Sequence, residues 1–130
     1  MSYLADTVAL VRHLRGGKRL GARVKKILEE ADAGLHTIYI SGVTLMEILY
    51  LSESRRIPID LKAVQDLLTR SRNYRVIPIG MEVVTMAVGI DDVPELHDRL
   101  IVATAKLLTV PILTNDPVMS GSKHGTTIWK

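Results

Sequence analysis

Residues 3–14 read YLADTVALVRHL, a short apolar run that ends at a carboxylate and passes directly into a helical pattern. Residues 3–5 are expected to form a buried strand, and apolar side chains from Val8 to Leu14 recur at the spacing of a helix face that packs on a core. The glycine pair after this run is a typical helix stop. The stretch therefore predicts a strand followed at once by a helix, with Asp6 at the junction.

The same alternation continues to the end of the chain. β-Branched and aromatic residues predict further strands at 37–40, 74–79, 111–114 and 126–129. Apolar residues at helical spacing predict further helices over 18–32, 43–53, from Pro58 onward, 81–89 and 97–108. Alternating strands and helices form right-handed β-α-β units. We therefore predict an α/β fold, a three-layer sandwich with a parallel sheet flanked by helices on both faces.

The length and composition suit one packed domain over residues 1–130. The sequence is 47 % hydrophobic and 24 % charged, the balance of a globular protein. No cysteine is present, which excludes a disulfide framework and a thiolate zinc site and fits a reducing compartment. Apolar stretches fall short of the ~20 residues that cross a bilayer, and Asp6 lies where an export signal would be apolar. We expect a cytoplasmic protein with no membrane-spanning segment.

Basic residues are concentrated early in the chain. The formal net charge is +3, which favours an anionic partner without naming one. One early stretch carries seven of the cations: Arg12, Arg15, Lys18, Arg19, Arg23, Lys25 and Lys26. Two interpretations stay open at this point, a solvated helix face and a surface that contacts phosphates.

Four carboxylates occupy positions where they can share one site. Asp6 and Asp116 each follow a predicted strand, and the carboxyl ends of parallel strands meet at one edge of the sheet. Glu47 and Asp98 lie in predicted helices. Each acid alone fits a structural role, as a helix cap, a charge at a helix terminus or a partner for arginine. Together they would repel one another with no cation of the chain obviously beside them, and a bound metal ion would remove that conflict.

The ligand types indicate which ion such a cluster would take. Only oxygen donors are offered, with no cysteine and no pair of histidines one helical turn apart, and this favours Mg²⁺ or Mn²⁺ over zinc. Such ions activate a bound water for attack on a phosphoryl group and stabilise charge on the leaving oxygen. The cluster therefore indicates metal-dependent phosphoryl chemistry.

Several short segments occur in the order and at the spacing of a known family. They are YLADT at 3–7, VTLME at 43–47, DRLIVATA at 98–105, LTND at 113–116 and the closing Ile128-Trp129. Each segment alone is a weak signal. The ordered set, which covers essentially the whole chain, resembles the PIN domain and in particular the VapC-like toxin ribonucleases.

This resemblance implies a fold, a site and partners. The sheet would have five parallel strands, and Mg²⁺ or Mn²⁺ would be held by Asp6, Glu47, Asp98 and Asp116. Thr7, Thr114 and Glu95 would support these ligands from just outside the metal. The activity implied is endonucleolytic cleavage of single-stranded or looped RNA, with candidate RNA contacts at Arg12, Arg15, Lys18, Arg19 and Arg23. A homodimer and a small antitoxin protein that covers the acidic cleft would complete the assembly.

The sequence departs from the family pattern at two places. Many members have Asn after the first Asp-Thr pair, where this chain has Val8. Many also have Asp-Pro three residues before the Asp-Arg pair, where this chain has Glu95-Leu96. The carboxylate at Glu95 is longer by one methylene. Neither change removes one of the four expected ligands.

Other functions fit the residues less well. A phosphotransferase of the haloacid-dehalogenase type would use Asp6 as nucleophile and needs a second Asp two residues on, where Val8 stands. A response-regulator receiver needs paired acids after its first strand and a lysine after its last, and Thr114 is followed by Asn115. The main alternative is a PIN-like scaffold that binds RNA or a partner without cutting, and the four intact acids argue against it.

Overall fold

Five strands form one sheet in the computed structural model, which describes residues 1–130. They are β1 (Ser2–Ala5), β2 (Thr37–Ser41), β3 (Tyr74–Ile77), β4 (Ile112–Leu113) and β5 (Thr127–Ile128). Every neighbouring pair is parallel, in the order β3-β2-β1-β4-β5. The predicted α/β class with a five-stranded parallel sheet is therefore confirmed.

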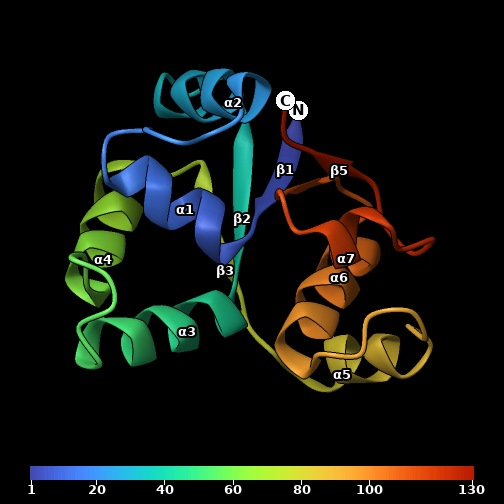
Figure 1. Ribbon diagram of the computed structural model, residues 1–130. Helices are drawn as coiled ribbons and strands as arrows, with labels where there is room; N and C mark the ends of the chain where they lie inside the picture. The colour runs from blue at the N-terminus through green and yellow to red at the C-terminus, as the bar shows by residue number, and fades with distance from the viewer.

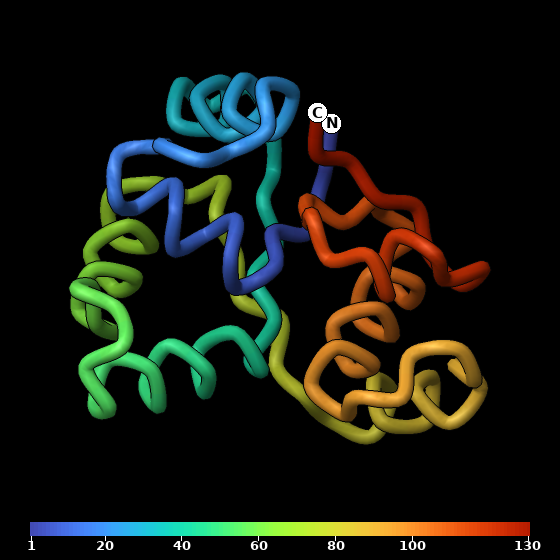
Figure 2. The backbone as a smooth tube through the Cα atoms, in the orientation of Figure 1, coloured from blue at the N-terminus to red at the C-terminus, as the bar shows by residue number.

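Seven helices cover the two faces of this sheet. They are α1 (Thr7–Leu14), α2 (Ala22–Asp32), α3 (Gly42–Glu53), α4 (Leu61–Arg70), α5 (Met81–Val88), α6 (Leu96–Leu108) and α7 (Pro117–Ser120). Figure 1 shows α1 to α4 on one side of the strands and α5 to α7 on the other. The segment from β3 into α5 carries the backbone from the first side to the second (Figure 2). No helix combines the length and the apolar character needed to cross a membrane.

The core is divided by the sheet into two clusters of buried side chains. Successive residues of a strand point to opposite faces, so Tyr3 and Ala5 of β1 join the cluster under α1, α2 and α4, and Leu4 joins the cluster under α5 and α6. The same alternation divides Ile112 and Leu113 of β4. Because both faces are covered, the strands are largely apolar, as is usual in parallel sheets.

The helix predicted over residues 18–32 begins later than expected, because α2 starts at Ala22. Residues 16–21 form a loop, in which Gly16, Gly17 and Arg19 have φ angles of 102°, 84° and 67°. These left-handed conformations cannot continue a right-handed helix. The cations at positions 18 and 19 therefore lie on a loop between α1 and α2.

Other element boundaries also differ from the prediction. Pro58 does not open a helix, because α4 begins at Leu61, where the Asp60 carboxylate accepts a hydrogen bond from Ala63 N at 3.3 Å. The single turn α7 was missed, and β3, β4 and β5 are shorter than predicted. Ser41 caps α3, because its hydroxyl accepts a hydrogen bond from Val43 N at 3.1 Å.

Candidate active site

The four predicted ligands line one cleft at the carboxyl edge of the sheet. Asp6 directly follows β1, and Asp116 comes shortly after β4, the strand that pairs with β1. Glu47 comes from the middle of α3 and Asp98 from the first turn of α6. The cleft has a volume of about 290 Å³ and is lined by Asp6, Thr7, Val8, Glu47, Asp98, Ile101, Asn115, Asp116, Pro117 and Met119. No lysine, arginine or histidine is among these residues.

Asp6 is the most deeply buried of the four acids. Only 3 % of the residue is exposed, and its Oδ1 caps α1 by accepting a hydrogen bond from Ala9 N at 2.8 Å. Burial raises the pKa of Asp6 to about 6, and the charges of Asp116 and Glu47 add to this rise against the opposing hydrogen bonds of Thr114 and Ala9. The charge of Asp6 is therefore unfavourable in the metal-free protein at neutral pH.

The pKa of Asp98 is affected by the same cluster of negative charges. Its pKa is also raised to about 6, first by partial burial and then by the charges of Asp116, Glu95, Glu47 and Asp6. None of the ion pairs in the structure involves any of the four cleft acids. The repulsion expected from the sequence is therefore present, and no ion pair with a basic side chain relieves it.

Glu47, Asp98 and Asp116 each keep at least one carboxylate oxygen without a hydrogen-bond partner in the protein. Asp116 uses only Oδ1, which caps α7 by accepting hydrogen bonds from Val118 N at 2.8 Å and Met119 N at 3.3 Å. Glu47 uses only Oε1, and the Asp98 carboxylate accepts no hydrogen bond. The donor set that remains is carboxylate oxygen alone, which suits Mg²⁺ or Mn²⁺.

Two threonine hydroxyls orient Glu47. Thr7 Oγ1 lies 2.6 Å from Glu47 Oε1 and 3.0 Å from Thr44 Oγ1. A hydroxyl has one proton, so when Thr7 donates to the carboxylate it must accept from Thr44. Thr44 is fully buried and was not predicted as a site residue, although it precedes Glu47 by three positions and so lies on the same side of α3. Thr7 therefore contacts one of the four predicted ligands.

Thr114 and Glu95 each accept a hydrogen bond from the backbone N–H of a cleft acid. Thr114 is buried, and its hydroxyl accepts a hydrogen bond from Asp116 N at 3.0 Å, which fixes the turn after β4. Glu95 caps α6, with Oε2 2.8 Å from Asp98 N and Oε1 2.8 Å from His97 Nδ1. Both oxygens of Glu95 are thus occupied, and Glu95 is not among the residues that line the cleft.

A basic groove adjoins the acidic cleft and shares Thr7 and Val8 with it. The groove has a volume of about 480 Å³, and its other lining residues are Val11, Arg12, Arg15, Lys18, Arg19, Leu51 and Ile57. Four of the five candidate RNA contacts therefore gather here, whereas Arg23 lies outside the lining. No arginine of the chain forms an ion pair with a carboxylate. The groove consequently presents uncompensated positive charge beside a cluster of negative charge.

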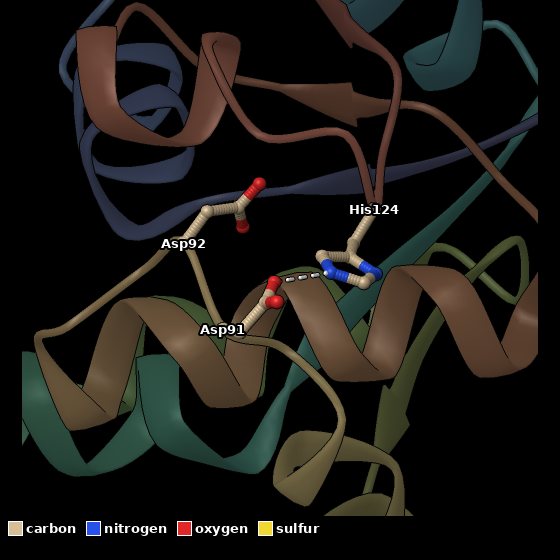
Figure 3. A group of neighbouring side chains, drawn as sticks. All are labelled: Asp91, Asp92 and His124. Carbon is tan, nitrogen blue, oxygen red and sulfur yellow. Dashed lines mark hydrogen bonds and ion pairs between the residues drawn. The ribbon is translucent and has the colours of Figure 1, made fainter.

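A second group with metal-ligand chemistry lies away from this cleft. Ligand atoms of Asp91, Asp92 and His124 lie within 4.8 Å of one another, and Figure 3 shows His124 facing Asp91. Asp92 accepts hydrogen bonds from Ser122 Oγ at 2.8 Å and Lys123 N at 2.9 Å, and His124 Nε2 lies 3.0 Å from Asp91. These contacts tie the segment before α6 to the segment before β5 and explain the group without an ion.

Comparisons with known proteins identify the relatives of this chain. The family model for the PIN domain matches residues 3–121. A chain in the crystal structure of VapBC2 from Rickettsia felis bound to a promoter DNA fragment has 17 % identity and a TM-score of 0.72, with 100 % of both chains covered. A toxin-antitoxin complex from Klebsiella pneumoniae has 20 % identity and a TM-score of 0.66, covering 97 % of this chain and 95 % of that one.

A third similar structure is FitAcB from Neisseria gonorrhoeae, with 20 % identity, a TM-score of 0.63, and coverage of 97 % of this chain and 96 % of that one. At these identities the likeness establishes a shared fold. A search of curated proteins found no match.

Proposed function

We propose that this chain, which belongs to the PIN domain family, is a metal-dependent endoribonuclease, with residues 1–130 acting as one nuclease domain. The observation that carries the proposal is the cleft itself. Carboxylates from four separate elements, Asp6, Glu47, Asp98 and Asp116, line it with no basic side chain among them. Such an arrangement is costly unless a cation binds, and at the end of parallel strands it lies where α/β proteins bind ligands.

We propose Mg²⁺ or Mn²⁺ as the ion, held by these four acids. When bound, the ion supplies the positive charge that makes water a better nucleophile and stabilises the leaving oxygen of a phosphodiester. The chain's own part is to hold the ligands in place. Caps at α1 and α7 fix Asp6 and Asp116, the Glu95 cap fixes the turn that carries Asp98, and the Thr7 hydroxyl fixes Glu47.

The groove supports RNA as the substrate. Its cations have no carboxylate partner, and it shares the lining residues Thr7 and Val8 with the cleft, so a strand whose phosphates lie along the groove would pass close to the acids. Arg15, Lys18 and Arg19 are the proposed phosphate contacts. The preference for single-stranded or looped RNA rests on the resemblance to VapC-like ribonucleases.

The alternative function is a PIN-like scaffold that binds RNA or a partner without cutting it.

A cleavage assay tests the nuclease proposal against this alternative. Purified protein should cleave RNA when Mn²⁺ or Mg²⁺ is present, and the cleavage should stop when EDTA is added. Asp98→Asn should abolish cleavage, whereas Asp60→Asn, a control that changes an exposed helix cap outside the cleft, should leave it intact. Cleavage that persists in EDTA and survives Asp98→Asn would rule out the metal mechanism, and binding without cleavage would support the scaffold.

We also propose that the chain is the toxin of a type II toxin–antitoxin pair in the cytoplasm. The likeness in fold to a chain of a toxin–antitoxin complex supports this. Groove and cleft adjoin at Thr7 and Val8, so one segment of a small antitoxin protein would cover both and place an arginine among the carboxylates. We expect a short reading frame that overlaps this gene immediately upstream. Purification of the chain from its native host without a partner would count against the pair.

A homodimer is the last part of the proposal. Large apolar side chains stand exposed on two helices, with Met46 and Tyr50 of α3 each 60 % exposed and Met81 and Val88 of α5 each 81 % exposed. Exposed apolar side chains of this size favour association with another surface. Light scattering at high protein concentration should give the mass of two chains. A strict monomer would contradict this part alone and would leave the nuclease proposal standing.

A further inference from the structure

We propose that Arg12 and Trp129 are positioning residues for the basic loop, residues 16–21, and that they promote RNA binding only through Lys18 and Arg19. The inference rests on the proposed function, because it concerns how the groove beside the cleft is built. It assigns to Arg12 a role different from the direct phosphate contact that the sequence suggests.

The basic loop has a conformation that it cannot easily hold by itself. Gly16, Gly17 and Arg19 all have positive φ angles, and Arg19 has a Cβ that makes its value of 67° unfavourable. Within the second half of the loop, the hydrogen bond from Leu20 N to Gly17 O is long at 3.4 Å. Strained residues of this kind persist only where surrounding contacts determine their position. The contacts that hold the loop should therefore come from outside it.

Arg12 supplies one such contact from α1. Its Nη1 donates a hydrogen bond to the backbone carbonyl of Arg19 at 3.1 Å. Its guanidinium carbon lies 5.8 Å from the centroid of the Trp129 ring, within the range of a cation–π interaction. The guanidinium thus links the strained Arg19 of the loop to Trp129, the single tryptophan of the chain, and this leaves the guanidinium poorly placed to contact a phosphate.

Trp129 holds the other end of the loop through its backbone. Its carbonyl accepts a hydrogen bond from Val24 N at 3.3 Å, in the first turn of α2, where Gly21 provides no side-chain cap. A Cβ on Gly21 would lie 2.0 Å from the same carbonyl, so the two backbones are in direct contact. Figure 2 shows the C-terminus beside the start of α2. The ring and the carbonyl of one residue therefore fix both the loop and the helix that follows.

The basic loop presents two cations to the groove. Lys18 and Arg19 both line the groove, and the loop that carries them is pre-ordered by Arg12 and Trp129. If the ring is removed, the loop must be ordered when RNA binds, and that entropy is subtracted from the binding free energy. Trp129→Leu keeps the carbonyl contact and removes only the ring, and Arg12→Lys keeps the charge and removes the planar group that bridges ring and carbonyl.

The binding experiment is a double-mutant cycle with a short labelled oligouridylate as probe, in EDTA so that no cleavage occurs. Trp129→Leu should weaken affinity by about fivefold, the upper part of the range for loss of an exposed cation–π contact. In the Lys18→Ala/Arg19→Ala background the same change should have no further effect. Tyr50→Leu is the matched control, because it removes the other cation–π contact, in which the Arg56 guanidinium carbon lies 5.6 Å from the centroid of the Tyr50 ring. An equal loss in both backgrounds would overturn the proposal.

Limited trypsin digestion tests the same inference without RNA. Trypsin cleaves after Lys18 and Arg19, and Trp129→Leu and Arg12→Lys should each speed cleavage at these bonds by about fivefold while Tyr50→Leu does not. If Trp129→Leu does not fold, Arg12→Lys alone tests the positioning role. Unchanged cleavage in the folded variants would refute the positioning role. If wild-type protein binds no oligouridylate at any salt concentration, the RNA part of the proposed function fails, and digestion alone decides this inference.

Discussion

Replacing Asp6 by asparagine should make the metal-free protein more stable. The asparagine Oδ1 can still accept the hydrogen bond from Ala9 N that caps α1, because Asn and Asp are about equally good at this position. The substitution removes a charge from a residue that is 3 % exposed and faces other carboxylates. Stabilisation by loss of a buried aspartate is the opposite of what a structural carboxylate gives, so the sign of the change tests the site.

The magnitude follows from the shift in the pKa of Asp6. Burial, with the neighbouring charges, raises this pKa from 3.8 to about 6, and each unit corresponds to ~1.4 kcal/mol between the two protonation states. The ionised carboxylate therefore costs the folded state up to ~3 kcal/mol above pH 6. The buried amide of asparagine recovers only part of this, because its own N–H groups need partners. We expect a gain of ~1 kcal/mol, which is about 4 °C in Tm for a chain of this size.

The stability of the metal-free protein should change with pH in a defined direction. Because the pKa of Asp6 is higher in the folded than in the unfolded protein, the folded state binds the extra proton, and the cost disappears as pH falls from about 6 toward 4. Asp98, whose pKa is also raised to about 6, adds a smaller term of the same sign because it is only half-buried. Metal-free wild type should therefore gain stability as the pH is lowered from 8 to 5, and the advantage of Asp6→Asn should shrink over the same range.

The assay is thermal unfolding followed by circular dichroism in EDTA and again with Mn²⁺. Wild type should gain stability with Mn²⁺ by mass action on the folded state, and Asp6→Asn should gain much less. Asp60→Asn, which changes an exposed cap on α4, should have a Tm close to that of wild type in EDTA and respond fully to Mn²⁺. If Asp6→Asn melts lower than wild type in EDTA and responds to Mn²⁺ as wild type does, Asp6 is structural and the four-ligand site is wrong.

Three further outcomes are expected. Thr44→Val removes the hydroxyl that contacts Thr7 and should lower Mn²⁺ affinity, measured by titration, by roughly tenfold, whereas the control Thr69→Val on α4 should not change it. Equal Mn²⁺ affinities of Thr44→Val and wild type would contradict this role of Thr44. Neutralising Lys18 and Arg19 should reduce the slope of log affinity for RNA against log salt concentration by about 0.7 for each lost phosphate contact, and adding Arg23→Ala should not change the slope further. An unchanged slope would mean that these cations only face solvent. Gly21→Ala should destabilise the fold by more than ~2 kcal/mol in urea unfolding, since its Cβ would lie 2.0 Å from Trp129 O, and a neutral effect would contradict the backbone contact.

The alternation of strands and helices could be predicted from the sequence because it depends on local periodicity. Tyr3 to Ala5 and Thr37 to Ile40 have the composition of buried strands, and the helix predicted over residues 43–53 begins at Gly42, directly after its capping residue Ser41. A cap acts through bonds to residues two or three positions away, so its signal is contained in a short window. At α4 the capping residue is Asp60, two positions after Pro58, so the helix start predicted at Pro58 is wrong.

Boundaries and contacts that depend on distant residues could not be predicted in this way. The start of α2 is set by Gly21 against Trp129, at the other end of the chain, and no local pattern at residues 18–21 indicates that contact. Thr44 has the right spacing from Glu47, but its hydroxyl matters because Thr7 of α1 lies between them. The division of the cations between a groove and a solvated helix likewise follows from the loop conformation.

For the site, the sequence by itself determined which carboxylates could meet. Asp6 and Asp116 follow strands of a parallel sheet, and the parallel direction brings their ends to one edge whatever the strand order. Only the tertiary structure decided that β4 pairs with β1, that α3 and α6 bring Glu47 and Asp98 to the same cleft, and that burial raises the pKa of Asp6 to about 6. Periodicity is a property of neighbours in the chain, whereas burial and charge repulsion depend on distances between residues that only the packing of the whole sheet and its helices establishes.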